Sequence, residues 1–190
     1  MDLELEVLEV GCGTGLLSLL VAPKVRSLTA VDTSSGMISA LQAKLKVQSE
    51  VSNIKPVCAL LEDADDARIR DSSAPDVPKR FDLVISHLVL HHIPSLSDIL
   101  RTMYGTLKPG GQVALTDFEN FGPEARKFHP ESKMEGVERH GIERSEMEKI
   151  LKDAGLVDVK VETAFKLDKE VEGGDKTEFP FLICLGKKAA

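Results

Sequence analysis

The chain has 190 residues, of which 42% are hydrophobic, and its formal net charge at pH 7 is −7. Proteins that bind nucleic acids usually present a basic surface, so this charge argues against a nucleic-acid substrate. No apolar run approaches the ~20 residues that cross a bilayer, and no secretory signal is visible, so we expect no membrane association. The cysteines Cys12, Cys58 and Cys184 are odd in number and lack the spacing of metal ligands, which favours reduced thiols and a cytoplasmic location.

Apolar runs alternate with amphipathic segments along the first part of the chain, which predicts a parallel sheet with helices on both faces. We expect strands at 5–10, 28–31, 54–58, 81–86 and 112–116, and helices at 16–21, 36–48 and 97–107. The polar, proline-punctuated stretch 62–80 predicts a loop with one short helix. A helix at 144–154 and two strands at 157–167 and 179–186, joined by a turn at Gly173 and Gly174, are expected to add an antiparallel hairpin.

Three alternating glycines, Gly11, Gly13 and Gly15, separate the first strand from the first helix, and Asp32 ends the second strand. Glycines allow a tight turn and a close approach of a ligand to the backbone, and an acidic residue at the next strand end can bind ribose hydroxyls. The dinucleotide fingerprint requires a third glycine where this chain has Leu16, and no phosphate-binding lysine follows the glycines. The pattern therefore predicts a site for an adenosine-containing molecule of another type.

The arrangement Glu9-x-Gly11-x-Gly13-x-Gly15 resembles the first motif of class I S-adenosylmethionine-dependent methyltransferases. The later motifs that support the resemblance lie at 31–37, 62–64, 81–86, 107–111 and 140–155. The resemblance covers most of the chain, from residue 5 to residue 187, and is nearest to the small-molecule enzymes of the type 11-like group. It implies an α/β fold: a Rossmann-like, doubly wound, mostly parallel seven-stranded sheet with an antiparallel C-terminal hairpin, in one methyltransferase domain over residues 1–190.

The resemblance also implies S-adenosyl-L-methionine as cofactor, with the three glycines against its methionine part and Asp32 on its ribose. The full set of cofactor-binding residues that it implies is Glu9, Gly11, Gly13, Gly15, Asp32, Thr33, Met37, Asp63, Ala64, Ser86 and His87. Thr33 and Met37 would flank the adenine, Asp63 and Ala64 would meet its edge, and Ser86 and His87 would lie beside the reacting methyl group. Three alternatives stay open: an acidic neighbour could replace Asp63, Met37 could belong to the helix core, and Glu9 could only support the glycine loop.

Five histidines are candidates for catalysis, because an imidazole titrates near neutral pH and could deprotonate an acceptor. The catalytic residue stays unknown, with His87, His91 and His140 as the candidates, and His129 competes with His140 in the same region. His87 and His91 have the spacing of helical metal ligands, but no third ligand follows at an obvious distance. We therefore expect no metal.

A Gly- and Pro-rich stretch at 119–140 interrupts the alternation and is expected to form part of the acceptor pocket. The predicted function is methyl transfer to a small-molecule acceptor. The alternatives are a non-catalytic scaffold that binds the cofactor and, less favoured because of Leu16, a nicotinamide-dependent oxidoreductase.

Only eight residues precede Glu9, whereas class I enzymes of this type usually carry lid helices before the first strand. One wall of the pocket is then expected to be missing, or to come from a partner chain, a dimer or the stretch 119–140. A truncated sequence is the simpler explanation.

Overall fold

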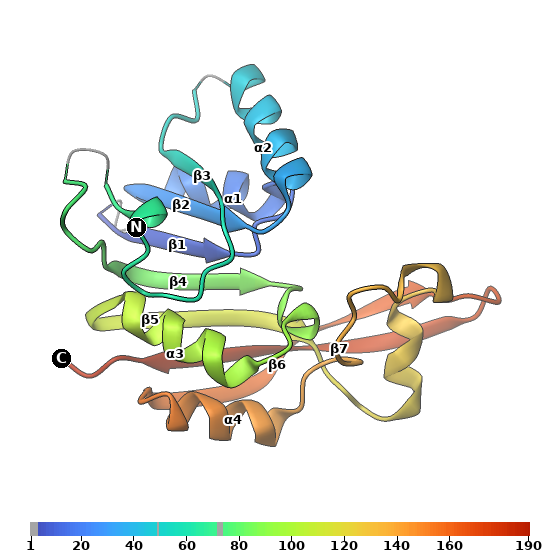
Figure 1. Cartoon of the computed structure of the whole chain (residues 1–190). Helices are drawn as coiled ribbons and strands as arrows, with labels where there is room; N and C mark the ends of the chain where they lie inside the picture. The colour runs from blue at the N-terminus through green and yellow to red at the C-terminus, as the bar shows by residue number, and fades with distance from the viewer. Residues whose placement is uncertain (1–3, 49, 72–73) are drawn as a thin grey trace.

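The computed structural model describes residues 4–48, 50–71 and 74–190, in which helices and strands alternate (Figure 1). The strands are β1 (Glu6–Val10), β2 (Ser27–Asp32), β3 (Ile54–Cys58), β4 (Phe81–His87), β5 (Leu107–Phe118), β6 (Val157–Glu170) and β7 (Lys176–Lys187). The α-helices are α1 (Leu16–Val21), α2 (Ser35–Val47), α3 (Leu96–Thr106) and α4 (Arg144–Asp153). Short 3-10 helices are η1 (Ala22–Lys24), η2 (Ala67–Ile69), η3 (Leu90–His92), η4 (Pro123–Phe128) and η5 (Glu131–Lys133). Among the residues described, no helix is both long enough and apolar enough to cross a membrane.

One seven-stranded sheet runs through the molecule, in the order β3-β2-β1-β4-β5-β7-β6. Strands β1 to β5 pair in parallel, and β7 pairs antiparallel with both β5 and β6. The strand order reverses between β1 and β4, which opens a crevice at the carboxyl ends of these two strands. The predicted fold class, a Rossmann-like, mostly parallel sheet with an antiparallel C-terminal hairpin, is confirmed.

Both faces of the sheet are covered, because successive side chains of a strand point to opposite faces. In β1, Leu8 and Val10 belong to the core beneath α3 and α4, whereas Val7 belongs to the core beneath α1 and α2. Figure 1 shows α3 and α4 in front of the sheet and α1 behind it. The helices contribute Leu100, Met103, Met147 and Leu151 to the first core and Ile38 and Leu41 to the second. This packing holds the ends of β1, β2 and β4 rigidly, and the candidate site lies there.

The predicted element boundaries differ from the structure mainly in the last three strands. β5 begins at Leu107 and not at Gln112, because Leu107 pairs with Phe81 of β4 ahead of a register shift, and Gly110 and Gly111 form backbone hydrogen bonds with Lys188. β6 continues to Glu170 and β7 begins at Lys176, so the hairpin is longer than predicted. The predicted loop at 62–80 contains η2, while its residues 72 and 73 lie outside the described part of the chain. The expectation about the start of the chain concerns in part residues 1–3, which also lie outside it.

A third, aromatic core supports the segment 119–140. It consists of buried residues from β5, η4, the hairpin turn and β7, namely Phe118, Phe128, Val171, Phe179 and Phe181. The rings of Phe118 and Phe128 stack with centroids 4.1 Å apart. Figure 1 shows the segment (yellow) alongside the part of the β6–β7 hairpin that extends beyond the parallel strands. The aromatic core thus holds a stretch without long helices close to the carboxyl edge of the sheet.

Candidate functional site

The three predicted glycines form the turn between β1 and α1, and all have positive φ angles, 75° for Gly11, 52° for Gly13 and 79° for Gly15. Each glycine meets a different constraint. A Cβ on Gly11 would lie 2.3 Å from a Val89 methyl group, and a Cβ on Gly15 would lie 2.3 Å from a Leu41 methyl group. No atom would lie within 4 Å of a Cβ on Gly13. Gly13 is therefore where the backbone is open to an approaching ligand.

Asp32 connects the end of β2 to this turn. One carboxylate oxygen accepts a hydrogen bond from the Gly13 N–H at 2.8 Å, and the other accepts one from the Ser34 N–H at 2.8 Å. Each oxygen of an ionised carboxylate has two acceptor positions, so both can still accept a hydroxyl proton. Ser34 itself caps α2, since its side chain accepts a hydrogen bond from the Met37 N–H at 3.3 Å. Asp32 is thus fixed in orientation and retains acceptor capacity.

Glu9 lies beneath the turn and is 2% exposed. Burial raises its pKa to about 7, a hydrogen bond from Ser18 opposes this, and the nearby Asp32 charge adds to the rise. The Ser18 hydroxyl lies 2.5 Å from the Glu9 carboxylate. The Cys12 thiol nearby has its pKa raised to about 12 by burial and by the charges of Glu9 and Asp32, so it stays protonated near neutral pH.

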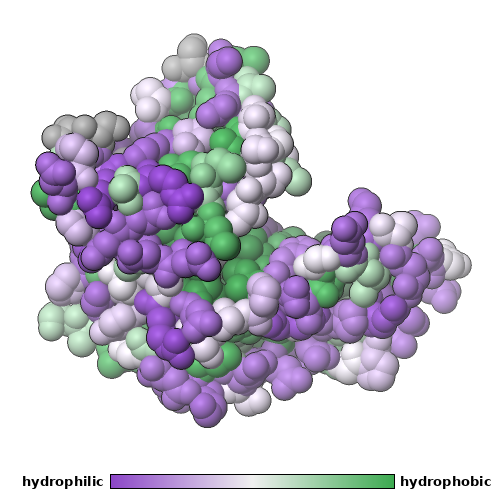
Figure 2. All heavy atoms as spheres, viewed as in Figure 1, coloured by the Kyte–Doolittle hydropathy of each residue, from purple (hydrophilic) through white to green (hydrophobic). Residues whose placement is uncertain are grey.

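A cavity of about 720 Å³ opens at these residues. It is lined by the glycine turn, the end of β2 and the segments that follow β3 and β4, and most of its wall is apolar. Figure 2 shows apolar side chains (green) gathered in the hollow between the α2 side of the molecule and the 119–140 side. A volume of this size is in the range of small-molecule and cofactor sites.

Seven of the predicted residues line this cavity: Glu9, Gly11, Gly13, Asp32, Thr33, Met37 and His87. Gly15 does not line it, because it caps the start of α1 and packs against Leu41. Ser86 does not line it either, because its hydroxyl is buried and donates to the Val10 carbonyl oxygen at 2.8 Å. Ser86 lines a neighbouring hollow of about 420 Å³ on the α1 side, which His87 also lines.

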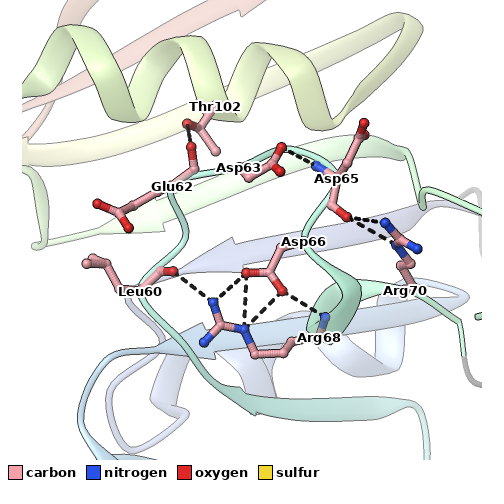
Figure 3. A network of polar contacts seen from close by, with 8 residues as sticks. All are labelled: Leu60, Glu62, Asp63, Asp65, Asp66, Arg68, Arg70 and Thr102. Atoms are coloured by element: carbon pink, nitrogen blue, oxygen red, sulfur yellow. Dashed lines mark hydrogen bonds and ion pairs between the residues drawn. The ribbon is translucent and has the colours of Figure 1, made fainter.

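Asp63 and Ala64 are not brought to the cavity. Asp63 is exposed and accepts a hydrogen bond from the Asp65 N–H at 2.9 Å, within the polar network of Figure 3. Ala64 packs toward α3, where a Cβ on Gly105 would lie 2.6 Å from its methyl group. The chain turns away after β3 because Thr102 of α3 donates a hydrogen bond to the Glu62 carbonyl oxygen at 3.1 Å.

The neighbouring acidic residues do not replace Asp63 in the cavity wall. Asp66 pairs with Arg68 at 2.5 Å, and the Asp65 carboxylate pairs with Arg80 at 2.5 Å. The wall at this point consists of Ala59, Leu60 and Leu61, which follow β3 directly. Their position directly after a predicted strand is the feature of the sequence that could have indicated them.

Sequence reasoning also missed the wall that follows β4. Leu88, Val89, His92, Ile93 and Pro94 line the cavity there. This wall depends on a sharp change of chain direction after His87, where Leu88 adopts a positive φ of 56°. Positive φ is uncommon for a residue other than glycine, and no sequence pattern marks it here.

The catalytic candidates occupy different positions. His87 is half-buried, with Nδ1 2.6 Å from the Thr116 hydroxyl, and burial lowers its pKa, so its ring is neutral near pH 7. His91 is buried, and its Nδ1 lies 2.8 Å from an Asp117 carboxylate oxygen. Neither His91 nor His140 lines the cavity, whereas His92 does. Burial and the neighbouring His91 and His92 rings lower the pKa of His129 to about 4.

Comparison with known proteins agrees with this geometry. A family model described as a methyltransferase domain matches residues 2–161. The chain belongs to the class I S-adenosylmethionine-dependent methyltransferase family. In this methyltransferase the glycine turn and Asp32 thus lie where the sequence motifs predicted them, at the carboxyl edge of the sheet.

Relatives with assigned activities include two O-methyltransferases. The chain is 33% identical over 119 residues to malonyl-[acyl-carrier protein] O-methyltransferase of Priestia megaterium, covering 62% of this chain and 38% of that protein. It is 30% identical over 124 residues to ubiquinone biosynthesis O-methyltransferase of Pseudomonas savastanoi pv. phaseolicola, covering 65% of this chain and 48% of that protein. The chain therefore spans less than half the length of these two relatives.

Solved structures show the same fold at low sequence identity. A methyltransferase from Methanosarcina mazei superposes with a TM-score of 0.67 and 18% identity, covering 100% of this chain and 95% of that one. Phosphoethanolamine N-methyltransferase 2 of Haemonchus contortus, solved with S-adenosyl-L-methionine, gives a TM-score of 0.70 and 16% identity, covering 100% of this chain and 50% of that one.

Proposed function

We propose that this methyltransferase binds S-adenosyl-L-methionine in the 720 Å³ cavity and transfers its methyl group to a small-molecule acceptor. The observation that carries the proposal is the orientation of Asp32, which is fixed by two backbone hydrogen bonds beside the open backbone of Gly13. A carboxylate held in this way can accept both ribose hydroxyls of an adenosine group.

The lining residues support one orientation of the cofactor. The ribose would bind Asp32, and the adenine would lie between Met37 and the apolar residues Leu60 and Leu61. The methionine part would then extend over Gly13 toward Glu9. Adenine is a flat, largely apolar group, so an apolar wall with few polar atoms suits it. In this orientation the reacting methyl group points toward the side of the cavity near His87.

Methyl transfer places few chemical demands on the protein. The acceptor atom forms a bond to the methyl carbon while the carbon–sulfur bond breaks, and the sulfonium leaves as a neutral thioether. Alignment of the two reactants is therefore the main contribution, worth up to about 7–11 kcal/mol in favourable cases. The acceptor loses its proton, and we assign the role of base to His87, because it is the one predicted catalytic candidate that lines the cavity and its ring is neutral.

We infer that the acceptor atom is an oxygen, since the two relatives compared above are O-methyltransferases. The segment 119–140 is assigned as an acceptor-side part of the single methyltransferase domain. Its support by the aromatic core near the carboxyl edge agrees with this assignment.

The three free cysteines support a cytoplasmic location. A partner chain could cover the cavity rim, where Leu16 and Met37 are 71% and 44% exposed.

The test is calorimetric titration of the protein with S-adenosylhomocysteine, before and after the change Asp32→Ala. We expect the change to weaken binding by about 2–4 kcal/mol, because two ribose hydroxyls lose their acceptor. Thermal unfolding of both proteins is the control, since Asp32 also holds Gly13 and Ser34. Unchanged affinity in a folded variant would contradict the assignment. A titration with a nicotinamide dinucleotide tests the oxidoreductase alternative, which predicts binding of that dinucleotide. A radiolabelled methyl-transfer assay tests the non-catalytic alternative, which predicts cofactor binding without transfer.

A further inference from the structure

Three imidazoles meet beside the cavity, from His91, His92 and His129. Each offers a ring nitrogen, and these three atoms lie within 4.8 Å of one another. His91 and His92 belong to η3, which follows β4, whereas His129 directly follows η4 in the segment 119–140. The centroid of the His91 ring lies 4.0 Å from that of the His92 ring and 4.9 Å from that of the His129 ring. The cluster borders the cavity through His92. The cluster differs from the pair His87 and His91 that sequence spacing suggested, because His87 is not part of it and His129 comes from a distant part of the chain.

Two of the rings are oriented by hydrogen bonds on their Nδ1 atoms. The Nδ1 of His91 lies 2.8 and 2.9 Å from the two Asp117 carboxylate oxygens, and the Nδ1 of His92 lies 2.7 Å from the Gly136 carbonyl oxygen. The Gly136 carbonyl oxygen can only accept, and both Asp117 oxygens also accept backbone N–H groups, so Nδ1 is the donor in each pair. In a neutral imidazole with this tautomer, Nε2 carries the lone pair. A carboxylate or backbone carbonyl on one ring nitrogen is the usual support of a histidine that binds a metal through the other.

Two nitrogens of the cluster are buried without a hydrogen-bond partner, Nε2 of His91 and Nδ1 of His129. Buried polar atoms in proteins are nearly always paired, so two unpaired nitrogens in one cluster require an explanation. The Asp117 carboxylate is fully buried, and it also accepts hydrogen bonds from the His91 and Phe118 N–H groups. The position of His91 is therefore fixed by the fold, and its unpaired nitrogen is part of a built arrangement.

We propose that His91, His92 and His129 form a binding site for a late first-row divalent metal ion, with Zn²⁺ as the simplest occupant. Imidazole nitrogens suit such ions, whereas Mg²⁺ and Ca²⁺ prefer oxygen ligands. Three protein ligands leave a fourth position for water or another ligand, as in zinc sites that are not purely structural. Zn–N distances of about 2.0–2.1 Å place tetrahedral nitrogens about 3.3 Å apart. The three nitrogens lie within 4.8 Å of one another, so binding requires the exposed His92 and the half-buried His129 to move toward the buried His91 by up to about 1.5 Å.

A metal at this position would join η3, which lines the cavity through His92, to the segment 119–140, and so fix this part of the cavity wall relative to that segment. This role does not depend on the identity of the cofactor or on methyl transfer. It is therefore independent of the proposed function, and the two can fail separately.

The test uses the full chain after removal of metal with a chelator, titrated with Zn²⁺ in competition with a chromophoric chelator. We expect one Zn²⁺ per chain, and an affinity at least about 100-fold lower in His129→Gln and in His92→Gln, because loss of outer-shell partners alone costs 10- to 100-fold. The matched control is His140→Gln, which removes an imidazole from the same segment but outside the cluster and should bind Zn²⁺ as the parent does. Circular dichroism establishes that each variant is folded.

A second readout tests the coordination directly. Co²⁺ added to the metal-free protein should give the visible absorption bands of a tetrahedral site, and these bands should be lost in His129→Gln and kept in His140→Gln. The proposal is overturned if the parent protein does not bind Zn²⁺, or if folded His92→Gln and His129→Gln bind it as tightly as His140→Gln does.

Discussion

Replacing Glu9 with glutamine should change the pH dependence of stability in a defined direction. The Glu9 carboxyl is buried and its pKa is raised from 4.5 to about 7, chiefly by burial. Between these two pH values the folded protein holds a proton on Glu9 that the unfolded chain has released. The parent protein therefore loses stability as pH rises from about 4.5 to about 7. Above about pH 7, the whole stabilising contribution of the protonated Glu9 has been lost.

The size of the effect follows from the pKa difference. One pKa unit corresponds to about 1.4 kcal/mol, so a difference of about 2.5 units corresponds to roughly 3 kcal/mol over the full range. Some of this loss of stability has already occurred at pH 5, so the change between pH 5 and pH 8 is smaller than the full value. Between pH 5 and pH 8 we expect the unfolding free energy of Glu9→Gln to rise by about 2–3 kcal/mol relative to the parent protein. The amide keeps the shape of the carboxyl group and can still accept the Ser18 hydroxyl proton.

The assay is urea unfolding of both proteins at pH 5 and pH 8 in the same ionic strength. The control is Glu162→Gln, which changes an exposed residue of β6 in the same chemical way and should show no such shift between the two pH values. If the difference between Glu9→Gln and the parent protein is the same at pH 5 and pH 8, the carboxyl is already ionised in the folded state, and our account of its burial is refuted.

Three further predictions concern the turn and the core. Gly13→Ala should weaken binding of S-adenosylhomocysteine at least tenfold in a titration. The control is Gly110→Ala, because Gly110 has a similar positive φ and an equally open Cβ position. Both changes should lower the unfolding free energy by about 1 kcal/mol, but Gly110→Ala should leave binding unchanged. Equal affinity of both variants for S-adenosylhomocysteine would contradict the claim that the ligand approaches the backbone at Gly13. Lys44→Met should also weaken binding, because the Lys44 ammonium holds Thr14 of the turn through hydrogen bonds of 2.8 and 3.0 Å; unchanged affinity would show that the turn does not need this support. Met103→Ala should lower the unfolding free energy by about 2–5 kcal/mol in urea titration, because the Met103 side chain of α3 is fully buried in the core; a loss below about 1 kcal/mol would mean that the core closes around the change.

The parallel part of the fold could be predicted because its signals are local. Apolar runs predicted β3 and α1 with the observed bounds. The glycine turn and Asp32 were also recognisable, because their spacing reflects backbone requirements of one short segment.

The parts that were missed depend on contacts between distant segments. Asp63 was expected at the cavity, but Thr102 and Arg80 hold its neighbours elsewhere, and these contacts leave no trace in the local pattern. The meeting of His91 with His129 depends on the aromatic core beneath the segment 119–140, which forms only when the hairpin folds back. Spacing along the chain could not reveal either arrangement.

The central claim is tested most directly by a crystal structure of the protein with S-adenosylhomocysteine. We expect the ribose hydroxyls within hydrogen-bond distance of the Asp32 carboxylate, the adenine against Leu60 and Leu61, and the homocysteine part over Gly13. A well-occupied ligand outside this cavity, or a ribose that does not contact Asp32, would contradict the account.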